Sequence, residues 1–162
     1  MEDICVMMDG YKFNYRVAAI IKNDGKILLH KSKKDDFYAI PGGRVKVGES
    51  SIKTLKREFI EEIGKDINIK DFTGLVENFF EYKEKKYHEI MFLFNVEFVD
   101  NDLYNVEKIT GLEENGKIEF IWKNINELKN LDVRPIFLKE KLLKTEKIGH
   151  IINNKLEYIS YL

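Results

Sequence analysis

The sequence predicts an α/β fold in which two layers of helix enclose a mixed β-sheet. Three observations lead to this prediction. Apolar segments rich in β-favouring residues lie on both sides of the stretch Pro41–Lys65. That stretch opens with a Pro-Gly-Gly turn and continues into an amphipathic helix. A further helical segment, Arg134–Lys144, lies near the C-terminus. With 162 residues, 44% of them hydrophobic, the chain suits one domain, 1–162, with a sizeable core.

The segments before the central helix predict a hairpin that leads into the turn. Phe13–Ile21 is an expected strand, Asn23–Gly25 carries the Asp-Gly signal of a tight turn, and Lys26–His30 is the expected return strand. A charged loop follows, after which Phe37–Ile40 brings the chain to the Pro-Gly-Gly turn.

After the helix, Tyr87–Phe98 is the clearest strand of the chain, and its aromatic and apolar centre places it in the middle of the expected sheet. The other expected elements are an extended segment at Ile67–Tyr82 broken near Gly74, a long acidic loop at Val99–Gly116, a strand at Ile118–Trp122, helices at Asn124–Leu131 and Arg134–Lys144 with Pro135 in the first turn of the latter, and a final strand or hairpin within Ile148–Leu162.

The central helix carries acidic and apolar residues on separate faces. Glu58, Glu61 and Glu62 stand at i, i+3 and i+4, so at about 100° per residue their carboxylates gather on one face. An apolar stripe on another face is formed by Ile52, Leu55, Phe59 and Ile63. Each like-charge pair destabilises a free helix by roughly 0.2–0.5 kcal/mol, and a divalent cation would reverse that effect. The alternative is a solvated acidic face, partly neutralised by Lys53, Lys56 and Lys65.

The spacing of glycine, glutamate and arginine in this stretch resembles the Nudix box of the Nudix hydrolases. Gly43 is followed after five residues by Glu49, and after seven more by the run Arg57–Gly64, REFIEEIG. One position departs from the family pattern, because Lys65 stands where the family usually has an aliphatic residue. The resemblance implies a Nudix α/β/α sandwich and metal-dependent hydrolysis of the phosphoanhydride bond in a nucleoside diphosphate linked to another group, X.

The resemblance also implies roles for individual residues. The family positions that bind Mg²⁺ or Mn²⁺ correspond to the Gly42 carbonyl, Glu58, Glu61 and Glu62, and one of these carboxylates is the implied general base. A further acid often comes from a distant loop. In this chain the loop Val99–Gly116 would supply it, and its candidates are Asp100, Asp102, Glu107, Glu113 and Glu114.

The remaining residues of the box have implied structural roles. Glu49 is expected to form a partly buried ion pair with Arg57, which fixes the turn so that the Gly42 carbonyl points at the metal. For the two to meet, the chain must fold back at Gly48, because helix geometry alone would keep them apart. Gly43 and Gly64 complete the structural set.

Residues outside the carboxylate face are candidates for substrate contacts. Arg44 is either a phosphate contact or a surface residue, since a guanidinium suits phosphate oxygens. An aromatic at Phe37 or Tyr38 either stacks on a base or packs in the core. Tyr82 is close to a tyrosine typical of diadenosine-polyphosphate hydrolases, although a surface role fits it better. Phe80 stands where some ADP-ribose hydrolases of the family have proline, which counts against ADP-ribose.

Composition narrows the partners and the compartment. The net charge of −1 produces no global field for nucleic acid or an anionic membrane. The single cysteine and three scattered histidines form no zinc-type cluster. Neither a signal peptide nor an apolar run of about 20 residues is present. We therefore expect a cytoplasmic protein with a small nucleotide or nucleotide-like substrate and no membrane or stable nucleic-acid partner, and we allow for a homodimer.

Two alternatives to hydrolysis remain open at this level. A Nudix fold can act as a binding module that senses a nucleotide or metabolite without cleaving it, although the full set of box glutamates argues against this. Relatives on this fold also isomerise prenyl diphosphates with a catalytic cysteine. Cys5, expected on an N-terminal tail far in sequence from the box, makes the second alternative weaker.

Overall fold

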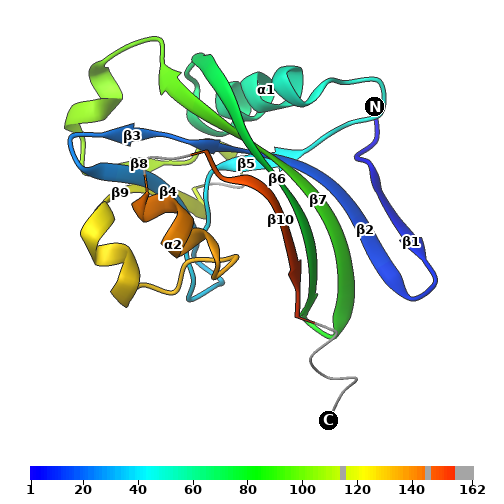
Figure 1. Ribbon diagram of the computed structural model, residues 1–162. Coiled ribbons are helices and arrows are strands. Elements are labelled where there is room, and N and C mark those ends of the chain that lie inside the picture. Colours follow the sequence, from blue (N-terminus) through cyan, green and yellow to red (C-terminus); the bar gives the residue numbers. More distant parts are fainter. Residues whose placement is uncertain (114–115, 145–146, 156–162) are drawn as a thin grey trace.

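The computed structural model describes residues 1–113, 116–144 and 147–155 (Figure 1). Its strands are β1 (Cys5–Met8), β2 (Tyr11–Ile20), β3 (Lys22–Asn23), β4 (Lys26–Ser32), β5 (Gly42–Arg44), β6 (Ile67–Tyr82), β7 (Lys85–Phe98), β8 (Lys108–Thr110), β9 (Ile118–Asn124) and β10 (Gly149–Asn154). Its helices are α1 (Ser51–Ile63) and α2 (Leu138–Leu143), with short 3₁₀ helices at Asp102–Asn105 and Ile125–Asn130.

The strands form two sheets. The larger has the order β1-β2-β7-β6-β10, with β5 paired to β2, and the smaller has the order β3-β4-β9-β8. The larger sheet is mixed, because β2 runs parallel to β7 and β10 parallel to β6, whereas β6 and β7 form a long antiparallel hairpin. The prediction that the β7 segment lies in the middle of a mixed sheet is confirmed.

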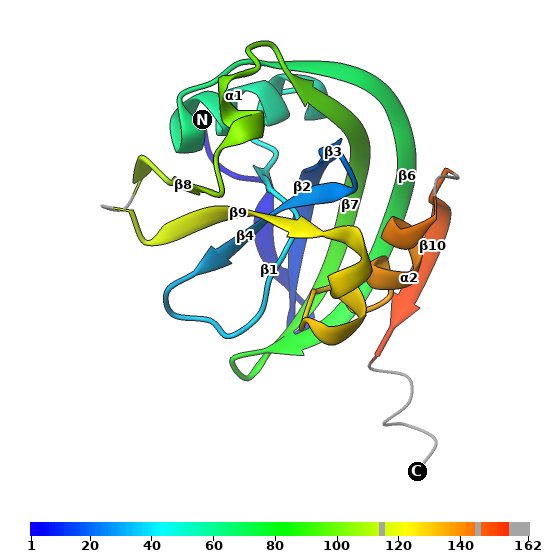
Figure 2. The same cartoon turned by 90° about the vertical axis from the view of Figure 1, so that its left-hand side faces the viewer.

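Helices cover the large sheet on its two faces, as Figures 1 and 2 show. On one face, α1 places Leu55 and Phe59 in a core cluster with Val17 of β2. On the other face, α2 places Leu138 in a second cluster with Ala18, the next residue of β2. Successive side chains of a strand point to opposite faces, so one strand supplies both cores. The expected arrangement of two helical layers around a mixed sheet is confirmed.

The hairpin predicted at Asn23–Gly25 is also present. Asp24 and Gly25 both have positive φ, 48° and 71°, which is the backbone of the tight turn that joins twisted antiparallel strands. Strand β3 on one side of the turn pairs with β4 on the other.

Several predicted elements differ in extent. The chain at Ile67–Tyr82 is not broken near Gly74 but forms one continuous strand with two register irregularities, at 69/71 and 72/74. The expected loop Val99–Gly116 contains a 3₁₀ helix and the strand β8. The two register irregularities absorb extra residues without ending strand β6, and sequence periodicity does not reveal them.

The expectations for both ends of the chain and for the helices also need correction. Cys5 lies in β1, paired with β2, and not on a tail. The helix expected at Asn124–Leu131 is a 3₁₀ helix at Ile125–Asn130, and the last α-helix begins at Leu138, so Pro135 precedes it. In α1, Ile52 is 45% exposed while Thr54 is buried in its place. A final strand is present as β10, and residues 156–162 lie outside the described part of the chain.

Candidate active site

Helix α1 is fixed at both ends by its own sequence. The Ser50 side chain caps the first turn by accepting a hydrogen bond from the Lys53 amide at 3.2 Å. Gly64 ends the helix in the left-handed conformation, with φ 76°, and its amide donates to the carbonyls of Phe59 and Ile60. Because the apolar stripe is buried, the helix is held in one orientation about its axis. The face that carries Glu58, Glu61 and Glu62 is therefore fixed as well.

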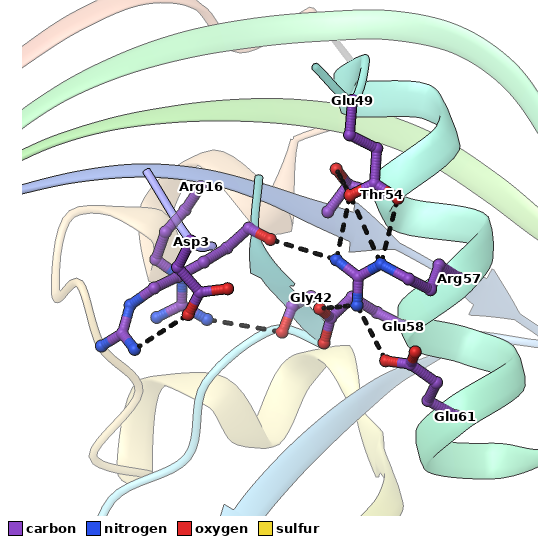
Figure 3. Close-up of polar contacts among 9 residues, drawn as sticks. Asp3, Arg16, Gly42, Glu49, Thr54, Arg57, Glu58 and Glu61 are labelled. Atoms are coloured by element: carbon purple, nitrogen blue, oxygen red, sulfur yellow. Dashed lines mark hydrogen bonds and ion pairs between the residues drawn. The ribbon is translucent and has the colours of Figure 1, made fainter. Parts of the chain in front are cut away.

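Arg57 is the centre of the polar contacts at this helix (Figure 3). Its Nε donates to Glu49 Oε1 at 3.1 Å, and its Nη1 donates to Glu58 Oε1 at 2.6 Å and Glu61 Oε2 at 2.8 Å. Its Nη2 reaches the Arg44 carbonyl at 3.3 Å. Burial lowers the pKa of the guanidinium, but the three carboxylates outweigh burial and hold that pKa above its usual value.

Glu49 is held by the two side chains that face it. Its carboxylate, 1% exposed, accepts hydrogen bonds from Arg57 and from Thr54 Oγ1 at 2.7 Å. The bonds from Arg57 outweigh burial and lower the pKa of Glu49 to about 2. The ion pair that the resemblance implied is therefore present. Glu49 reaches Arg57 because the chain reverses at Gly48, where φ is 79°.

This pairing predicts a pH-dependent contribution to stability. Because the folded-state pKa of Glu49 is about 2 and its ordinary value is 4.5, its contribution is complete above about pH 4.5. It should be lost as the pH falls towards 2. A depression of this size corresponds to roughly 3 kcal/mol of unfolding free energy. Urea unfolding between pH 2 and 6 should therefore show a steeper loss for wild type than for Glu49→Gln. Parallel profiles would contradict the assignment.

The glycines of the turn bring the backbone against α1 and β2. A side chain at Gly43 would collide with the Glu58 carboxylate, so only glycine lets that carboxylate lie over the turn. Gly42 has φ 156°, and a side chain there would collide with the β2 backbone at Val17 and Ala18. The Gly42 carbonyl accepts a hydrogen bond from Arg16 Nη2 at 3.4 Å.

The acidic face is electrostatically unfavourable as it stands. Burial, followed by the charges of Glu58 and Glu113, raises the pKa of Glu62 to about 8. Burial also raises the pKa of Glu58, although Arg57 opposes it. These are the shifts expected of like charges that share a poorly solvated space. Two of the three lysines proposed as neutralisers pair with other acids, Lys56 with Asp66 and Lys65 with Asp100 and Asp102.

One acid of the loop after β7 approaches the glutamates. Glu113 contributes to the raised pKa of Glu62, and the amide of its neighbour Leu112 donates to the Glu62 carbonyl at 2.8 Å. The candidates Asp100 and Asp102 are engaged by Lys65, and Glu107 lies beside Trp122 at a separate surface hollow. Glu114 lies outside the described residues. Among the described acids of this loop, Glu113 is the one that affects the pKa of Glu62, and which loop acid joins the site stays a prediction.

The donor set suits a hard divalent cation. Carboxylate oxygens and a backbone carbonyl are the ligands that Mg²⁺ and Mn²⁺ prefer, and Gly43 allows one carboxylate to lie against the turn. Within residues 1–113, 116–144 and 147–155, no three acidic, histidine or cysteine side chains already converge tightly enough to enclose an ion. Arg57 Nη1 instead bridges Glu58 and Glu61. Cation binding would therefore draw these two carboxylates away from Arg57.

The candidates for substrate contacts have other partners among the described residues. Arg44 forms an ion pair with Asp3 at 3.5 Å. The Tyr38 ring packs against the core cluster on the α2 side, with Lys31 over its face. The Tyr82 hydroxyl donates to Asp35 at 2.8 Å, at the β6–β7 turn, which lies at the opposite end of the sheet from α1 (Figure 1).

Arg16 was not singled out in the sequence, yet it lies beside the Gly42 carbonyl and contributes to the electrostatics of Glu58 and Glu62. Its Nε is buried without a partner among the described residues. The signal available in the sequence was its rarity, because it is one of only four arginines in a lysine-rich chain. Its position at the site depends on the pairing of β2 with β5, which the sequence did not reveal.

In the part of the chain that the structure describes, no helix has the length and apolar character needed to cross a membrane.

Comparisons with known proteins agree with this geometry. The NUDIX domain model matches residues 12–141. An ADP-ribose pyrophosphatase of Methanocaldococcus jannaschii is 32% identical over 90 residues, covering 54% of this chain and 52% of that protein. An 8-oxo-dGTP diphosphatase of Buchnera aphidicola is 30% identical over 111 residues, covering 66% of this chain and 77% of that protein. The solved MutT protein of Bacillus halodurans superposes with a TM-score of 0.63 at 19% identity, covering 88% of this chain and 91% of that one, and so supports the fold.

The family model covers most of the chain and includes the turn, Glu49, Arg57 and the three glutamates of α1. The chain therefore belongs to the Nudix hydrolase family.

Proposed function

We propose that this protein is a metal-dependent pyrophosphohydrolase that cleaves the phosphoanhydride bond of a nucleoside diphosphate linked to a group X. The observation that carries the proposal is the crowding of Glu58, Glu61 and Glu62 on one helix face, where burial and mutual repulsion raise the pKa values of Glu58 and Glu62. A purely structural face would place such charges in solvent. Here Glu58 is only 15% exposed, so its position favours a cationic ligand.

The residues that would hold Mg²⁺ or Mn²⁺ are the Gly42 carbonyl, Glu58, Glu61 and Glu62. When bound, the cation would supply neutralisation of phosphate charge and activation of water. Arg57 and Glu49 position the helix face against the turn, and Arg16, beside the Gly42 carbonyl, would contact the phosphates of the substrate. One of Glu58, Glu61 and Glu62 would accept a proton from the attacking water, while the others hold the cation. Glu113 lies close enough to Glu62 to raise its pKa in the metal-free protein.

The two alternatives are less compatible with the same observations. A sensing module has no need for carboxylates held in an unfavourable, desolvated arrangement. The isomerase alternative needs a cysteine at the site, and Cys5 lies on the edge strand β1. Turnover of a nucleoside diphosphate compound by Cys5→Ser at the wild-type rate would exclude the isomerase, and turnover of any such compound would exclude the sensing module.

The substrate X is best identified by a screen. Purified protein should be incubated with Mg²⁺ or Mn²⁺ and a panel of sugar nucleotides, dinucleotides and nucleoside triphosphates, with the products identified by mass spectrometry. The appearance of a nucleoside monophosphate from at least one compound is the expected result. Failure to cleave any compound, together with tight nucleotide binding, would favour the sensing module.

Metal binding should also stabilise the folded protein. A cation that binds only the folded state raises the melting temperature as its occupancy rises, and here it would also relieve repulsion among Glu58, Glu61 and Glu62. Millimolar Mg²⁺ should therefore raise the melting temperature, and EDTA should reverse the increase. The increase should shrink in Glu61→Gln but persist in Glu97→Gln, which alters a glutamate of β7 paired with Lys70. Equal shifts in both variants would place the metal elsewhere.

The single domain over residues 1–162, the cytoplasmic location and the homodimer remain predictions, as does the assignment of Gly43, Glu49, Arg57 and Gly64 to structural roles in the site. Gel filtration with light scattering would measure the oligomeric state.

A further inference from the structure

A row of buried polar side chains crosses the large sheet outside the Nudix box. Asn14 of β2 is paired with Glu89 of β7, Glu89 with Asn78 of β6, and Asn78 with Asn153 of β10. Because residues in register point to the same face, the four side chains form one continuous row, called here the polar row. Asn14, Glu89 and Asn78 are only 3–4% exposed.

The face that carries the polar row is the one opposite α1. Arg16 of β2 and Met91 of β7 lie two residues from the row on the same face, and Ala18 of β2 lies four residues from it. Ala18 and Met91 belong to the core cluster beneath α2. On the other side of the row, Phe80 and Tyr87 form a stacked ring pair with centroids 4.8 Å apart. The row thus lies between an apolar core and an aromatic pair.

The hydrogen bonds among the described residues leave one buried acceptor of the row without a donor. Asn153 Nδ2 donates to Asn78 Oδ1 at 2.6 Å, and Asn78 Nδ2 donates to Glu89 Oε1 at 3.4 Å. That is the one hydrogen bond that the described residues give to the Glu89 carboxylate. Asn14 Oδ1 is buried and has no partner among the described residues. A buried acceptor without a donor is costly, so Asn14 Oδ1, beside the Glu89 carboxylate, is an open position for an N–H group of a ligand.

The position of the row connects it to the acidic face of α1. Arg16, which contacts the Gly42 carbonyl, lies two residues from Asn14 on the same face of β2, a separation of about 7 Å. If the diphosphate of a ligand lies at Gly42 and the glutamates, the ligand would pass Arg16. The group attached to the diphosphate would then reach the polar row. The loop before β5 is held at the end of the large sheet where β6 turns into β7. There Asp35 accepts a hydrogen bond from the Tyr82 hydroxyl, and Phe37 packs against the Tyr82 ring.

We propose that the polar row, centred on Glu89 and Asn14, binds the base of the nucleotide substrate and selects bases that carry an exocyclic amino group. A carboxylate accepts hydrogen bonds from amino groups of guanine, adenine or cytosine, whereas uracil presents carbonyl acceptors in that place. Guanine offers two adjacent N–H donors and so matches the carboxylate best. This inference rests on the proposed function, since it takes the ligand to be a nucleotide.

The test measures binding without cleavage. GMP, AMP, CMP and UMP contain no phosphoanhydride bond, so calorimetric titrations in EDTA report base recognition separately from hydrolysis. At least one amino-bearing nucleotide should bind wild type roughly tenfold or more tightly than UMP, because a good bidentate pair distinguishes bases by about this factor. Equal binding of all four nucleotides by wild type would overturn the inference and needs no variant.

Two variants and a control assign the preference to the row. Glu89→Gln should reduce the discrimination against UMP at least several-fold, and Asn14→Ala should reduce it independently. Glu97→Gln makes the same chemical change on the same strand at a partly exposed glutamate and should leave the discrimination unchanged. If the melting temperature of Glu89→Gln falls while both Glu89→Gln and Asn14→Ala still discriminate against UMP, that result would overturn the inference and leave the row with a structural role only.

The outcomes separate this inference from the proposed function. Discrimination among monophosphates without hydrolysis of any diphosphate compound would contradict the hydrolase assignment but support the row. Hydrolysis of compounds with all bases at similar kcat/KM, with no discrimination among the monophosphates, would support the hydrolase assignment and overturn the inference.

Discussion

Replacing Glu61 by glutamine should lower kcat/KM by at least about two orders of magnitude while the protein remains folded. The side chain is 39% exposed, and its ion pair with Arg57 is one of several that Arg57 makes. Its removal should therefore cost little stability. Glutamine keeps the shape but removes the charge that we propose binds the metal. Steady-state kinetics at saturating Mg²⁺, with the substrate found in the screen, measures the effect.

Two controls show whether the loss comes from the acidic face. Glu97→Gln should retain wild-type kinetics, because Glu97 pairs with Lys70 on the sheet. Circular dichroism and the melting temperature in EDTA should be close to wild type for both variants. Full turnover by Glu61→Gln would remove the three-carboxylate face as the catalytic site.

The second large effect concerns the Glu49–Arg57 pair. Replacing Arg57 by a neutral residue should destabilise the fold by roughly 3 kcal/mol or more, because it leaves the buried Glu49 carboxylate without its charged partner. Glu49 is 1% exposed and Arg57 is 18% exposed, so solvent cannot compensate. Arg57→Lys keeps the positive charge but cannot reach Glu49, Glu58, Glu61 and the Arg44 carbonyl together. It should also weaken Mg²⁺ affinity and slow turnover.

A double-mutant cycle isolates this interaction. Urea unfolding of Glu49→Gln, Arg57→Lys and the double variant should give a coupling free energy of about 1–3 kcal/mol. The surface pair of Arg134 and Asp132, in which both side chains are largely solvated, provides the comparison and should couple by less than about 1 kcal/mol. Equal coupling for the two pairs would mean that Glu49 and Arg57 do not fix the turn against α1.

Much of the site could be predicted because its chemistry is local. The caps Ser50 and Gly64, the apolar stripe and the glutamates all lie within one helix and its ends, where spacing in sequence translates directly into spacing in space. The Glu49–Arg57 pair also required only a short reversal of the chain. Ile52 lies within the stripe by angle, but it stands in the first turn of α1, where it is 45% exposed. Thr54 lies outside the stripe and is nevertheless buried, where its hydroxyl donates to Glu49.

Contacts between distant segments could not be predicted in this way. The sequence offered several acids for the loop after β7, and the path of the chain past α1 brings Glu113 near enough to affect the pKa of Glu62. Arg16 reaches the Gly42 carbonyl because β5 pairs with β2. Strand pairing depends on which edges meet once the cores form, and neither periodicity nor composition encodes that choice directly.

The sequence by itself thus determined the helix, its carboxylate face and the family of the chain, because these depend on residues within about twenty-five positions of one another. Only the tertiary structure decided that Arg57 bridges Glu58 and Glu61, that Glu62 is desolvated, and that Asn14, Glu89, Asn78 and Asn153 form one row. The last four residues come from four strands spread over most of the chain. Their alignment is set by β-sheet register, which brings side chains together across the sheet regardless of their separation in sequence.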